Sequence, residues 1–440
     1  MNKIKIKSWI DEEKKILIIS VLLLINLVGF VLYCQHFINK GYLPSPFLYN
    51  KTDTFMDFYN ALYWSLNDQR YTEWKSVYPP LNFIILRFID FLFAGITLDS
   101  PIGLRENFPY LVLSVIVLFI VSNALILKTK YWKDFNKNEK ILLFLSFIIS
   151  SPVLFSVERG NLILICPVLL FLAINSFGIK RSLFIALLIN IKPYFFILNI
   201  YYLIKKDWKG FLNSILLSGL IYALTSIILG SEFFEFFKNI FDFSQNKSIF
   251  SLREVMAMPS SISAFSFVLK NESGAAFAKS YIALQNVHML IYTIEIFKWM
   301  ALLVSIIAIL RSADKITDLE VFAVIILIIS NMNIWIGGYI YIMYIILVPI
   351  FMKMRANNFY IACLLLIAMP LDFIPLTNEY IGFQMIYLTN LNTNIHWTLG
   401  LGSVLRPILN ILLLVAVSTE ILIRMNNKES FKLVRNEYQK

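Results

Sequence analysis

Apolar residues in this chain form long uninterrupted runs separated by short polar segments, a pattern unlike the alternation of half-buried strands. Most of these runs have about the length that is needed to cross the hydrocarbon core of a bilayer. They lie near 16–33, 108–127, 141–157, 162–178, 211–229, 287–310, 319–336, 339–352, 358–375 and 404–424. The pattern predicts an all-α polytopic membrane protein.

Two further apolar runs are not expected to cross the bilayer as single helices. The run at 81–97 contains Arg87 and Asp90, so we expect it to lie along or dip into the outer leaflet. The run at 183–204 is interrupted by Lys192, which precedes a proline. Each of its arms is only about 15 Å long at helical rise, too short for a core of about 30 Å. We therefore expect it to enter and return on the cytoplasmic side, which gives about twelve membrane helices in all.

The distribution of Lys and Arg predicts which loops face the cytoplasm. Basic residues gather in the N-terminal tail, in 128–140, 180–181, 205–209, 311–315 and 353–355, and after Arg424. The segment 376–403 has neither Lys nor Arg and is expected outside. This arrangement puts both termini in the cytoplasm of a multi-pass protein of the inner or plasma membrane.

The same arrangement predicts the domain organisation. We expect one membrane domain over 1–440 with two long outer loops, 34–107 and 230–281. The segment 108–229 completes a module with the first loop, and 282–440 supplies the C-terminal helices. Long loops in a compact membrane protein are usually functional, and here we expect them to carry juxtamembrane helices.

Composition narrows the choice of partners and cofactors. The 440 residues are 58% hydrophobic and 15% charged, with a formal net charge of +11. Because the basic residues are scattered over short loops, we expect membrane lipid and no nucleic acid as a partner. The three cysteines, at positions 34, 166 and 363, and the three histidines show no metal-binding spacing, so no metal or other cofactor is expected.

The first outer loop carries an acidic and aromatic group. Asp53 and Asp57 are one helical turn apart, so a helix through this stretch would place both on one face. Tyr59, Tyr63 and Tyr78 follow. Carboxylates bond sugar hydroxyls and aromatic rings stack on sugar rings, so this group suits acceptor or sugar contacts. An interfacial amphipathic helix with solvated acids and an aromatic belt is the alternative.

Charged residues next to apolar runs supply candidates for binding an anion. Glu158 and Arg159 lie at an abrupt boundary and are followed by Asn161, although a simple loop cap would look the same. Lys192 lies in the middle of an apolar stretch, where a lysine either snorkels or meets an anion such as phosphate.

The second outer loop adds donors suited to phosphate or sugar hydroxyls. These are Asn246, Ser248 and Arg253. A solvated loop would have much the same composition, so the alternative stays open.

Taken in order, these motifs resemble glycosyltransferase family 87, a branch of the C superfamily (GT-C) of membrane glycosyltransferases. The resemblance covers roughly 15–270. It rests on D-F-Y-N-A-L-Y at 57–63, Y-P-P-L at 78–81, E-R-G-N at 158–161, I-K-P at 191–193 and Q-N-K-S at 245–248. The family includes α-mannosyltransferases that use polyprenol-phosphate-mannose.

The resemblance implies a GT-C-type fold and assigns roles to residues. Asp57 would be the general base, and the residues around Arg159 and Lys192 would line the cavity that holds the phosphosugar donor. One departure concerns a later span, where family members commonly have Trp followed by one or two His. Here Trp335 is followed by Gly337 and Gly338, which leaves His288 or Tyr339 as the candidates for that role.

The sequence predicts the transfer of a hexose, with inversion, from a polyprenyl-phosphate sugar. The family resemblance implies that this hexose is mannose. The acceptor would be a lipid-linked or surface glycan on the outer face of the membrane. Two alternatives belong to other classes: a surface-polysaccharide polymerase of the O-antigen type, and a non-enzymatic transporter or flippase of lipid-linked sugars. The early position of the acidic loop favours the transferase over the polymerase, and the lack of repeat symmetry disfavours the transporter.

Overall fold

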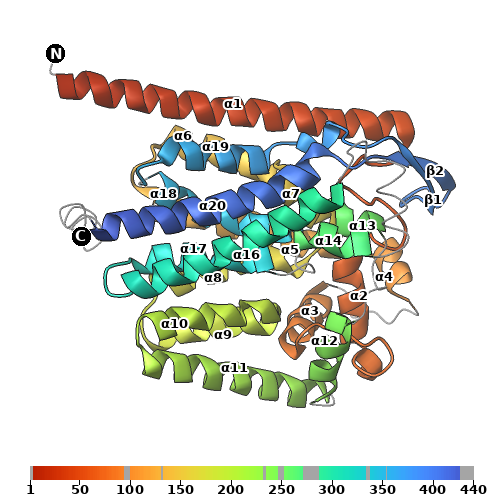
Figure 1. The fold of residues 1–440 in the computed structure, drawn as a ribbon. Coiled ribbons are helices and arrows are strands. Elements are labelled where there is room, and N and C mark those ends of the chain that lie inside the picture. Colours follow the sequence, from red (N-terminus) through yellow and green to blue (C-terminus); the bar gives the residue numbers. More distant parts are fainter. Residues whose placement is uncertain are drawn as a thin grey trace.

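The computed structural model describes residues 3–93, 100–129, 132–230, 234–245, 252–270, 287–332, 337–352 and 354–426. Most of them are helical. The long helices run roughly side by side, so that α1 begins and α20 ends at the same end of the bundle, while the β-hairpin and several short helices gather at the other (Figure 1). We refer to these as the terminal end and the hairpin end.

Four helices in the described residues are long and apolar enough to cross a bilayer. They are α1 (Lys3–Lys40), α11 (Trp208–Leu229), α16 (Val287–Ser312) and α20 (Leu401–Asn426). Two bent pairs would raise this number to six if each forms one span. The pairs are α4 (Pro101–Asn107) with α5 (Leu111–Ile126), bent by 75°, and α6 (Lys137–Ile148) with α7 (Ser151–Arg159), bent by 51°.

The remaining elements are shorter. Those within the bundle are η3 (Leu162–Ile165), α8 (Cys166–Asn175), α9 (Ile179–Ile191), η4 (Pro193–Asn199), α10 (Ile200–Ile204), α17 (Asp318–Met332), η5 (Gly338–Ile346), α18 (Val348–Phe351) and α19 (Asn357–Ala368). Those in the connecting segments are α2 (Met56–Ser65), η1 (Asp68–Arg70), α3 (Pro80–Phe93), α12 (Glu235–Gln245), α13 (Leu252–Ala257), α14 (Ser263–Lys270), η6 (Leu371–Phe373), β1 (Tyr380–Met385) and β2 (Asn392–Trp397). The prediction of about twelve membrane helices is therefore not confirmed, because many apolar runs are broken into pieces too short to span alone.

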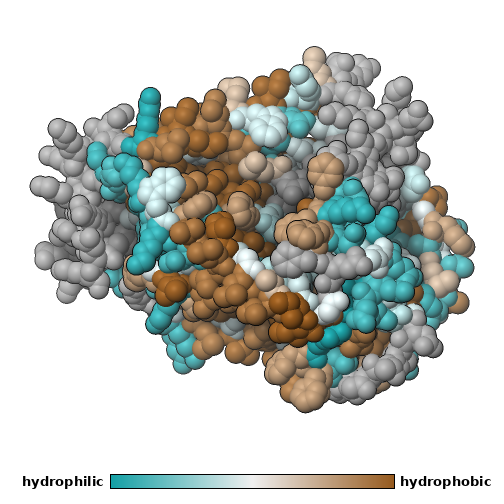
Figure 2. Space-filling model, turned by 90° about the horizontal axis from the view of Figure 1, so that it is seen from below, coloured by the Kyte–Doolittle hydropathy of each residue, from teal (hydrophilic) through white to brown (hydrophobic). Residues whose placement is uncertain are grey.

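On the face of the bundle shown in Figure 2, apolar residues fill the middle and hydrophilic residues lie toward both ends. Helices α5 and α11 are apolar on all sides, as expected for helices in contact with lipid. Exposed residues on α11 include Leu216, Leu220 and Ile227. The distribution supports a membrane protein.

The run at 183–204 reverses direction at Lys192, as expected. Helix α9 ends at Ile191, and η4 begins at Pro193, which lacks the backbone donor that would continue the helix. The two arms are tied near their open ends, where the hydroxyls of Ser182 and Tyr202 lie 2.9 Å apart. Lys192 thus forms the tip of a helical hairpin.

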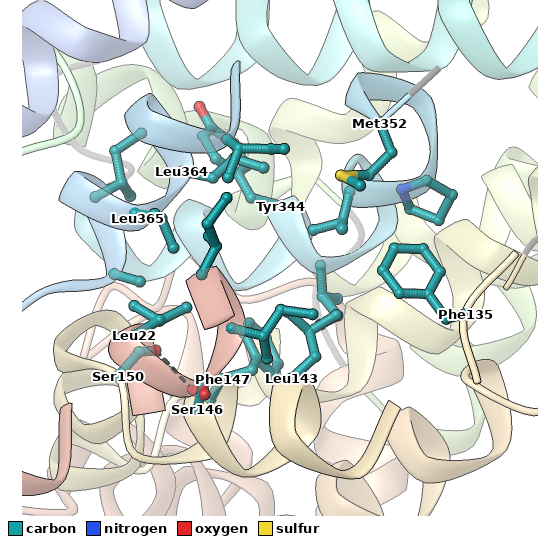
Figure 3. A pocket seen from close by; sticks show the side chains of 18 of the residues that line it. Leu22, Phe135, Leu143, Ser146, Phe147, Ser150, Tyr344, Met352, Leu364 and Leu365 are labelled. Carbon is teal, nitrogen blue, oxygen red and sulfur yellow. Dashed lines mark hydrogen bonds between the residues drawn. The ribbon is translucent and has the colours of Figure 1, made fainter. Parts of the chain in front are cut away.

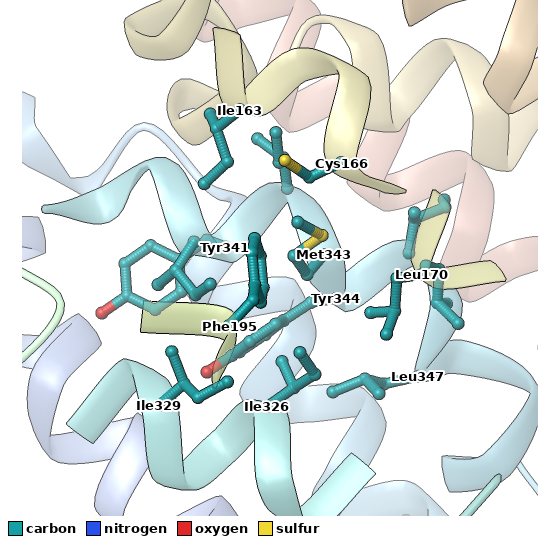
Figure 4. Packing of buried hydrophobic residues seen from close by; sticks show 14 of the residues in the cluster. Ile163, Cys166, Leu170, Phe195, Ile326, Ile329, Tyr341, Met343, Tyr344 and Leu347 are labelled. Atoms are coloured by element: carbon teal, nitrogen blue, oxygen red, sulfur yellow. The ribbon is translucent and has the colours of Figure 1, made fainter. Parts of the chain in front are cut away.

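The bundle core holds the helical hairpin of α9 and η4 in place. Phe195 of η4 packs among Cys166 of α8, Ile329 of α17 and Tyr344 of η5, all of which are buried (Figure 4). Tyr194, which follows Pro193 in η4, lies near Tyr339 at the start of η5. The C-terminal half of the chain therefore helps to position Lys192.

The fold is mostly helical, as predicted, but it also contains one small β-sheet. The segment 376–403, expected as an outer loop of an all-α protein, contains the antiparallel pair β1 and β2. Its pairing runs from Tyr380 opposite Trp397 to Met385 opposite Asn392. Isolated two-stranded hairpins are marginal in water, so this hairpin depends on what it packs against.

Candidate functional site

The start of α2 docks against the end of α7. The backbone N–H of Phe55 donates to the carbonyl of Glu158 at 2.7 Å. Phe55 precedes α2 with φ 61°, and Gly160 ends α7 with φ 66°. A Cβ at Gly160 would lie 3.0 Å from the Cβ of Phe58, so only glycine fits this close approach without displacement.

This junction brings both predicted carboxylates to one guanidinium. Arg159 lies 2.8 Å from an oxygen of Asp53 and 3.2 Å from Oδ1 of Asp57. The amide of Asn161 donates to Oδ2 of Asp57 at 2.7 Å. The expected single helix through both acids is wrong, because α2 begins only at Met56. The two acids nevertheless converge on the same partner.

The position of Asp57 on α2 also suits a negative charge. It lies in the first turn, where the helix dipole favours an anion. At the other end of α2, Arg70 donates to the carbonyl of Trp64 at 3.1 Å, and Arg87 donates to that of Ser65 at 2.6 Å. These cations bind carbonyls of the last turn, where the helix dipole favours positive charge. Helix α2 is thus anchored at both ends.

Lys192 lies beside this cluster. Its ammonium is 4.8 Å from the centre of the Tyr78 ring, and it is close enough to Asp57 for the two charges to interact. Burial raises the pKa of Tyr78 well above its usual value, and the Asp57 carboxylate raises it further, so its hydroxyl stays protonated. Among the described residues, no carboxylate forms a salt bridge with Lys192, which leaves its donors available.

Asn82 of α3 holds the tip of the helical hairpin formed by α9 and η4. Its amide donates to the carbonyl of Ile191 at 3.0 Å, directly before Lys192. Sequence analysis did not single out this residue. A buried asparagine two residues after Pro80 was the only available signal, and such residues are common at helix starts.

The C-terminal half contributes Tyr339, one of the two candidates for the missing histidine. Its hydroxyl bonds Arg159, and its ring stacks on Phe155 with centroids 5.2 Å apart. The preceding Gly338 donates to the carbonyl of Met258 at 2.6 Å and has no room for a Cβ. The two glycines after Trp335 therefore allow a close approach that delivers Tyr339. The side chain of His288, the other candidate, lies outside the described residues.

Tyr194 was missed by the sequence analysis. It follows the hairpin tip and lies near the hydroxyls of Tyr78 and Tyr339. Lys192, Asp57 and these three tyrosines all remain partly accessible. The site therefore combines a carboxylate, an ammonium and several hydroxyls, none of which is fully buried.

Glu158 has a structural role in this arrangement. Its Oε1 accepts bonds from the hydroxyl of Thr54 at 2.8 Å and from the backbone N–H of Tyr49 at 3.1 Å. It therefore holds the loop that precedes α2. Beside it, an apolar hollow of about 440 Å³ lies between the hairpin end of α1 and α7, with Phe30 and Val157 among its walls.

The β-hairpin holds the same loop from the other side. The side-chain amide of Gln384 in β1 donates to the carbonyl of Leu48 at 3.1 Å. The backbone N–H of Lys51 donates to the carbonyl of Met385 at 2.9 Å. Arg253 donates to the side chain of Gln384 and, at 3.0 Å, to the carbonyl of Leu48. Burial lowers the pKa of Arg253 to about 10, so it remains charged at neutral pH.

The other predicted contacts are placed as follows. Tyr59 is fully buried, and its hydroxyl donates to the carbonyl of Phe108 at 2.7 Å, so it supports α2 rather than facing a ligand. Tyr63 is partly accessible and packs edge-to-face on Trp74 at 5.4 Å. Asn246 and Ser248 lie outside the described residues.

Within the part of the chain that the structure describes, no three His, Cys, Asp or Glu side chains gather as metal ligands would.

Comparison with protein families shows where this chain resembles a known family. The profile of glycosyltransferase family 87 matches residues 77–330, which is more than half of the chain. This stretch includes Tyr78, Arg159, Asn161 and Lys192 but begins after Asp57. No curated protein and no solved structure matches the chain.

Proposed function

The chain belongs to glycosyltransferase family 87, and from this premise we propose that it transfers a hexose from a polyprenyl-phosphate sugar to an acceptor hydroxyl with inversion. The reaction would take place at the hairpin end, on the outer face of the cell's inner or plasma membrane. The acceptor would be a lipid-linked or surface glycan, and mannose is the hexose that the family resemblance favours.

The observation that carries the proposal is the placement of Asp57 next to Lys192. The Asp57 carboxylate takes the proton of the acceptor hydroxyl while that oxygen attacks the anomeric carbon. The bond from this carbon to the phosphate oxygen breaks on the opposite face, and the polyprenyl phosphate leaves with the electron pair. Lys192, which has no salt-bridge partner among the described residues, stabilises the charge that develops on the phosphate.

Arg159 positions the base in this scheme. Its guanidinium contacts the carboxylates of both Asp53 and Asp57. The shorter ion pair goes to Asp53, at 2.8 Å against 3.2 Å for Asp57. Asp53 thus offsets part of the positive charge of Arg159, and Asn161 orients the other oxygen of Asp57.

A lipid-linked substrate also needs room for its hydrocarbon. The apolar hollow between α1 and α7 adjoins Glu158, one residue from Arg159. In the proposed reaction it takes the part of the lipid chain nearest to the phosphate. This supports a substrate drawn from the membrane.

The test is transfer of a labelled hexose from its polyprenyl phosphate in vesicles that contain the protein. Asp57→Asn and Asp57→Ala should both abolish transfer, because neither side chain accepts the proton. Asp242→Asn is the matched control, since Asp242 is an exposed acid on α12. Transfer retained by both Asp57 variants would remove the proposed base. Movement of labelled lipid across the membrane without covalent product would favour the transporter instead.

A further inference from the structure

A second cavity, of about 720 Å³, lies between α1, α6, α18 and α19. It shares no lining residue with the cluster around Asp57. Figure 3 shows its apolar walls, which include Leu22 of α1, Leu143 and Phe147 of α6, and Leu365 of α19. Its volume falls in the range of about 300–1,000 Å³ that is typical of small-molecule sites.

The length of the cavity corresponds to one leaflet. Residues that line it occur along α19 from Asn357 to Ala368. At a rise of about 1.5 Å per residue this wall is about 16 Å long. The hydrocarbon core of a bilayer is about 30 Å thick, so the wall covers about half of it.

The charged and amide side chains that line the cavity lie at one end only, whereas the polar groups elsewhere on its walls are serine and tyrosine hydroxyls. Lys133, Asp134, Asn357 and Asn358 line it where α6 and α19 begin, near the terminal end of the bundle. Lys133 is exposed, and Lys137 is a second exposed lysine of the same segment. This end of the cavity is thus lined by one acid, Asp134, and the same segment carries the two exposed lysines. A polar mouth that carries an exposed lysine, above an apolar cavity, matches the build of an anionic phospholipid.

The packing of α1 shows why such a site exists. Helix α1 packs on α6, where the amide of Asn26 donates to the carbonyl of Ser146 at 2.9 Å. The cavity occupies the space on the neighbouring side, between α1 and α19. An empty apolar space of this size would lose the dispersion contacts of all its walls, whereas an acyl chain restores them.

We propose that this cavity binds an anionic phospholipid of the leaflet at the terminal end, with an acyl chain along α19 and the phosphate beside Lys133. A polyprenyl donor fits the observations less well. Its phosphate must lie near Lys192 at the hairpin end, whereas the polar mouth of this cavity is at the opposite end. The lipid joins α1 to α19 and is distinct from the substrate.

The test uses the full chain in nanodiscs of phosphatidylethanolamine with a minority of phosphatidylglycerol that carries a diazirine at the end of one acyl chain. After illumination, cross-linked peptides are mapped by mass spectrometry. Label should be enriched in α6 and α19 over α11, which faces lipid without lining the cavity. Ala368→Trp, which fills the cavity, should abolish the enrichment, and Leu365→Trp serves if that variant does not fold. The control Ala362→Trp, on the exposed face of α19, should retain it.

The charge of the headgroup is tested separately. Lys133→Gln should lower the preference for labelled phosphatidylglycerol over equally labelled phosphatidylethanolamine by about fivefold, the factor expected from one basic residue near an anionic headgroup. Lys137→Gln, which does not line the cavity, should have a smaller effect. The proposal is overturned by equal labelling of α11 and α19, by equal labelling with the two lipids, or by complete displacement of phosphatidylglycerol by undecaprenyl phosphate.

Discussion

Gly160 and Gly230 provide a matched pair for testing how the proposed base is positioned. They end α7 and α11 in almost the same backbone conformation, with φ 66° and ψ 29° at Gly160 and φ 63° and ψ 29° at Gly230. Their surroundings differ. A Cβ at position 160 would lie 3.0 Å from the Cβ of Phe58 and 3.2 Å from the carbonyl oxygen of Phe55, whereas nothing lies within 4 Å at position 230.

The expected magnitudes follow from this difference. Alanine in the left-handed region costs roughly 1–2 kcal/mol, and this applies to both Gly160→Ala and Gly230→Ala. Only at position 160 is there overpacking as well, which adds roughly 1–3 kcal/mol. Gly160→Ala should therefore lower the free energy of unfolding by about 2–5 kcal/mol, against about 1–2 kcal/mol for Gly230→Ala.

The extra contact also predicts a selective loss of activity. To relieve it, the start of α2 must move away from α7, which separates Asp57 from Arg159 and Asn161. A misplacement of about 1 Å can lower a catalysed rate on the order of a hundredfold. Gly160→Ala should accordingly lower hexose transfer at least tenfold, whereas Gly230→Ala should leave the rate per folded molecule near that of the unmodified protein.

The two variants should be compared by equilibrium unfolding in mixed micelles and by transfer in vesicles, with rates normalised to folded protein. Equal losses of unfolding free energy would show that the junction yields without strain. Equal transfer rates would show that the docking of α2 on α7 does not position the base. Either result would refute the role assigned here to Gly160.

Three further predictions concern other parts of the site and its support. Lys192→Gln should lower the transfer rate about 10²–10³-fold with unchanged expression, as is usual when one group that stabilises the transition state is removed. Lys192→Arg, which keeps the positive charge, should retain part of the transfer activity. Gln384→Ala should lower the rate about tenfold by freeing the loop before α2, whereas Phe383→Ala, on a side chain that is 71% exposed, should not. The buried pair of Arg406 and Asp372, 2.6 Å apart, should make Arg406→Met destabilising by about 3–5 kcal/mol in mixed micelles, and adding Asp372→Leu should recover much of that loss.

Much of the site could be proposed from local patterns. Lys192 was conspicuous because a charge followed by proline inside an apolar run has few structural explanations. Asp57, Arg159 and Asn161 were candidates for similar reasons, since each is a polar residue at the edge of the membrane. Their mutual pairing was not predictable, because it depends on contacts between segments about one hundred residues apart.

Other features could not be read from sequence. The expected helix through Asp53 does not form because Phe55 adopts a left-handed conformation that lets α2 dock on α7. The β-hairpin went unrecognised because its strands are short and its stability comes from Gln384 and its neighbours packing on a distant loop. Tyr339 was named only as a substitute for a histidine, and its bond to Arg159 depends on the fold of η5.

The sequence alone determined that this protein resides in a membrane, where the chain turns back at Lys192, and which charged residues lie next to apolar runs. These properties follow from hydrophobicity and proline chemistry, which act over a few residues at a time. Only the tertiary structure decided that Asp53 and Asp57 share Arg159 and that a C-terminal hairpin supports an N-terminal loop. Such pairings depend on long-range packing, in which the gain from each contact exists only after distant segments have been brought together.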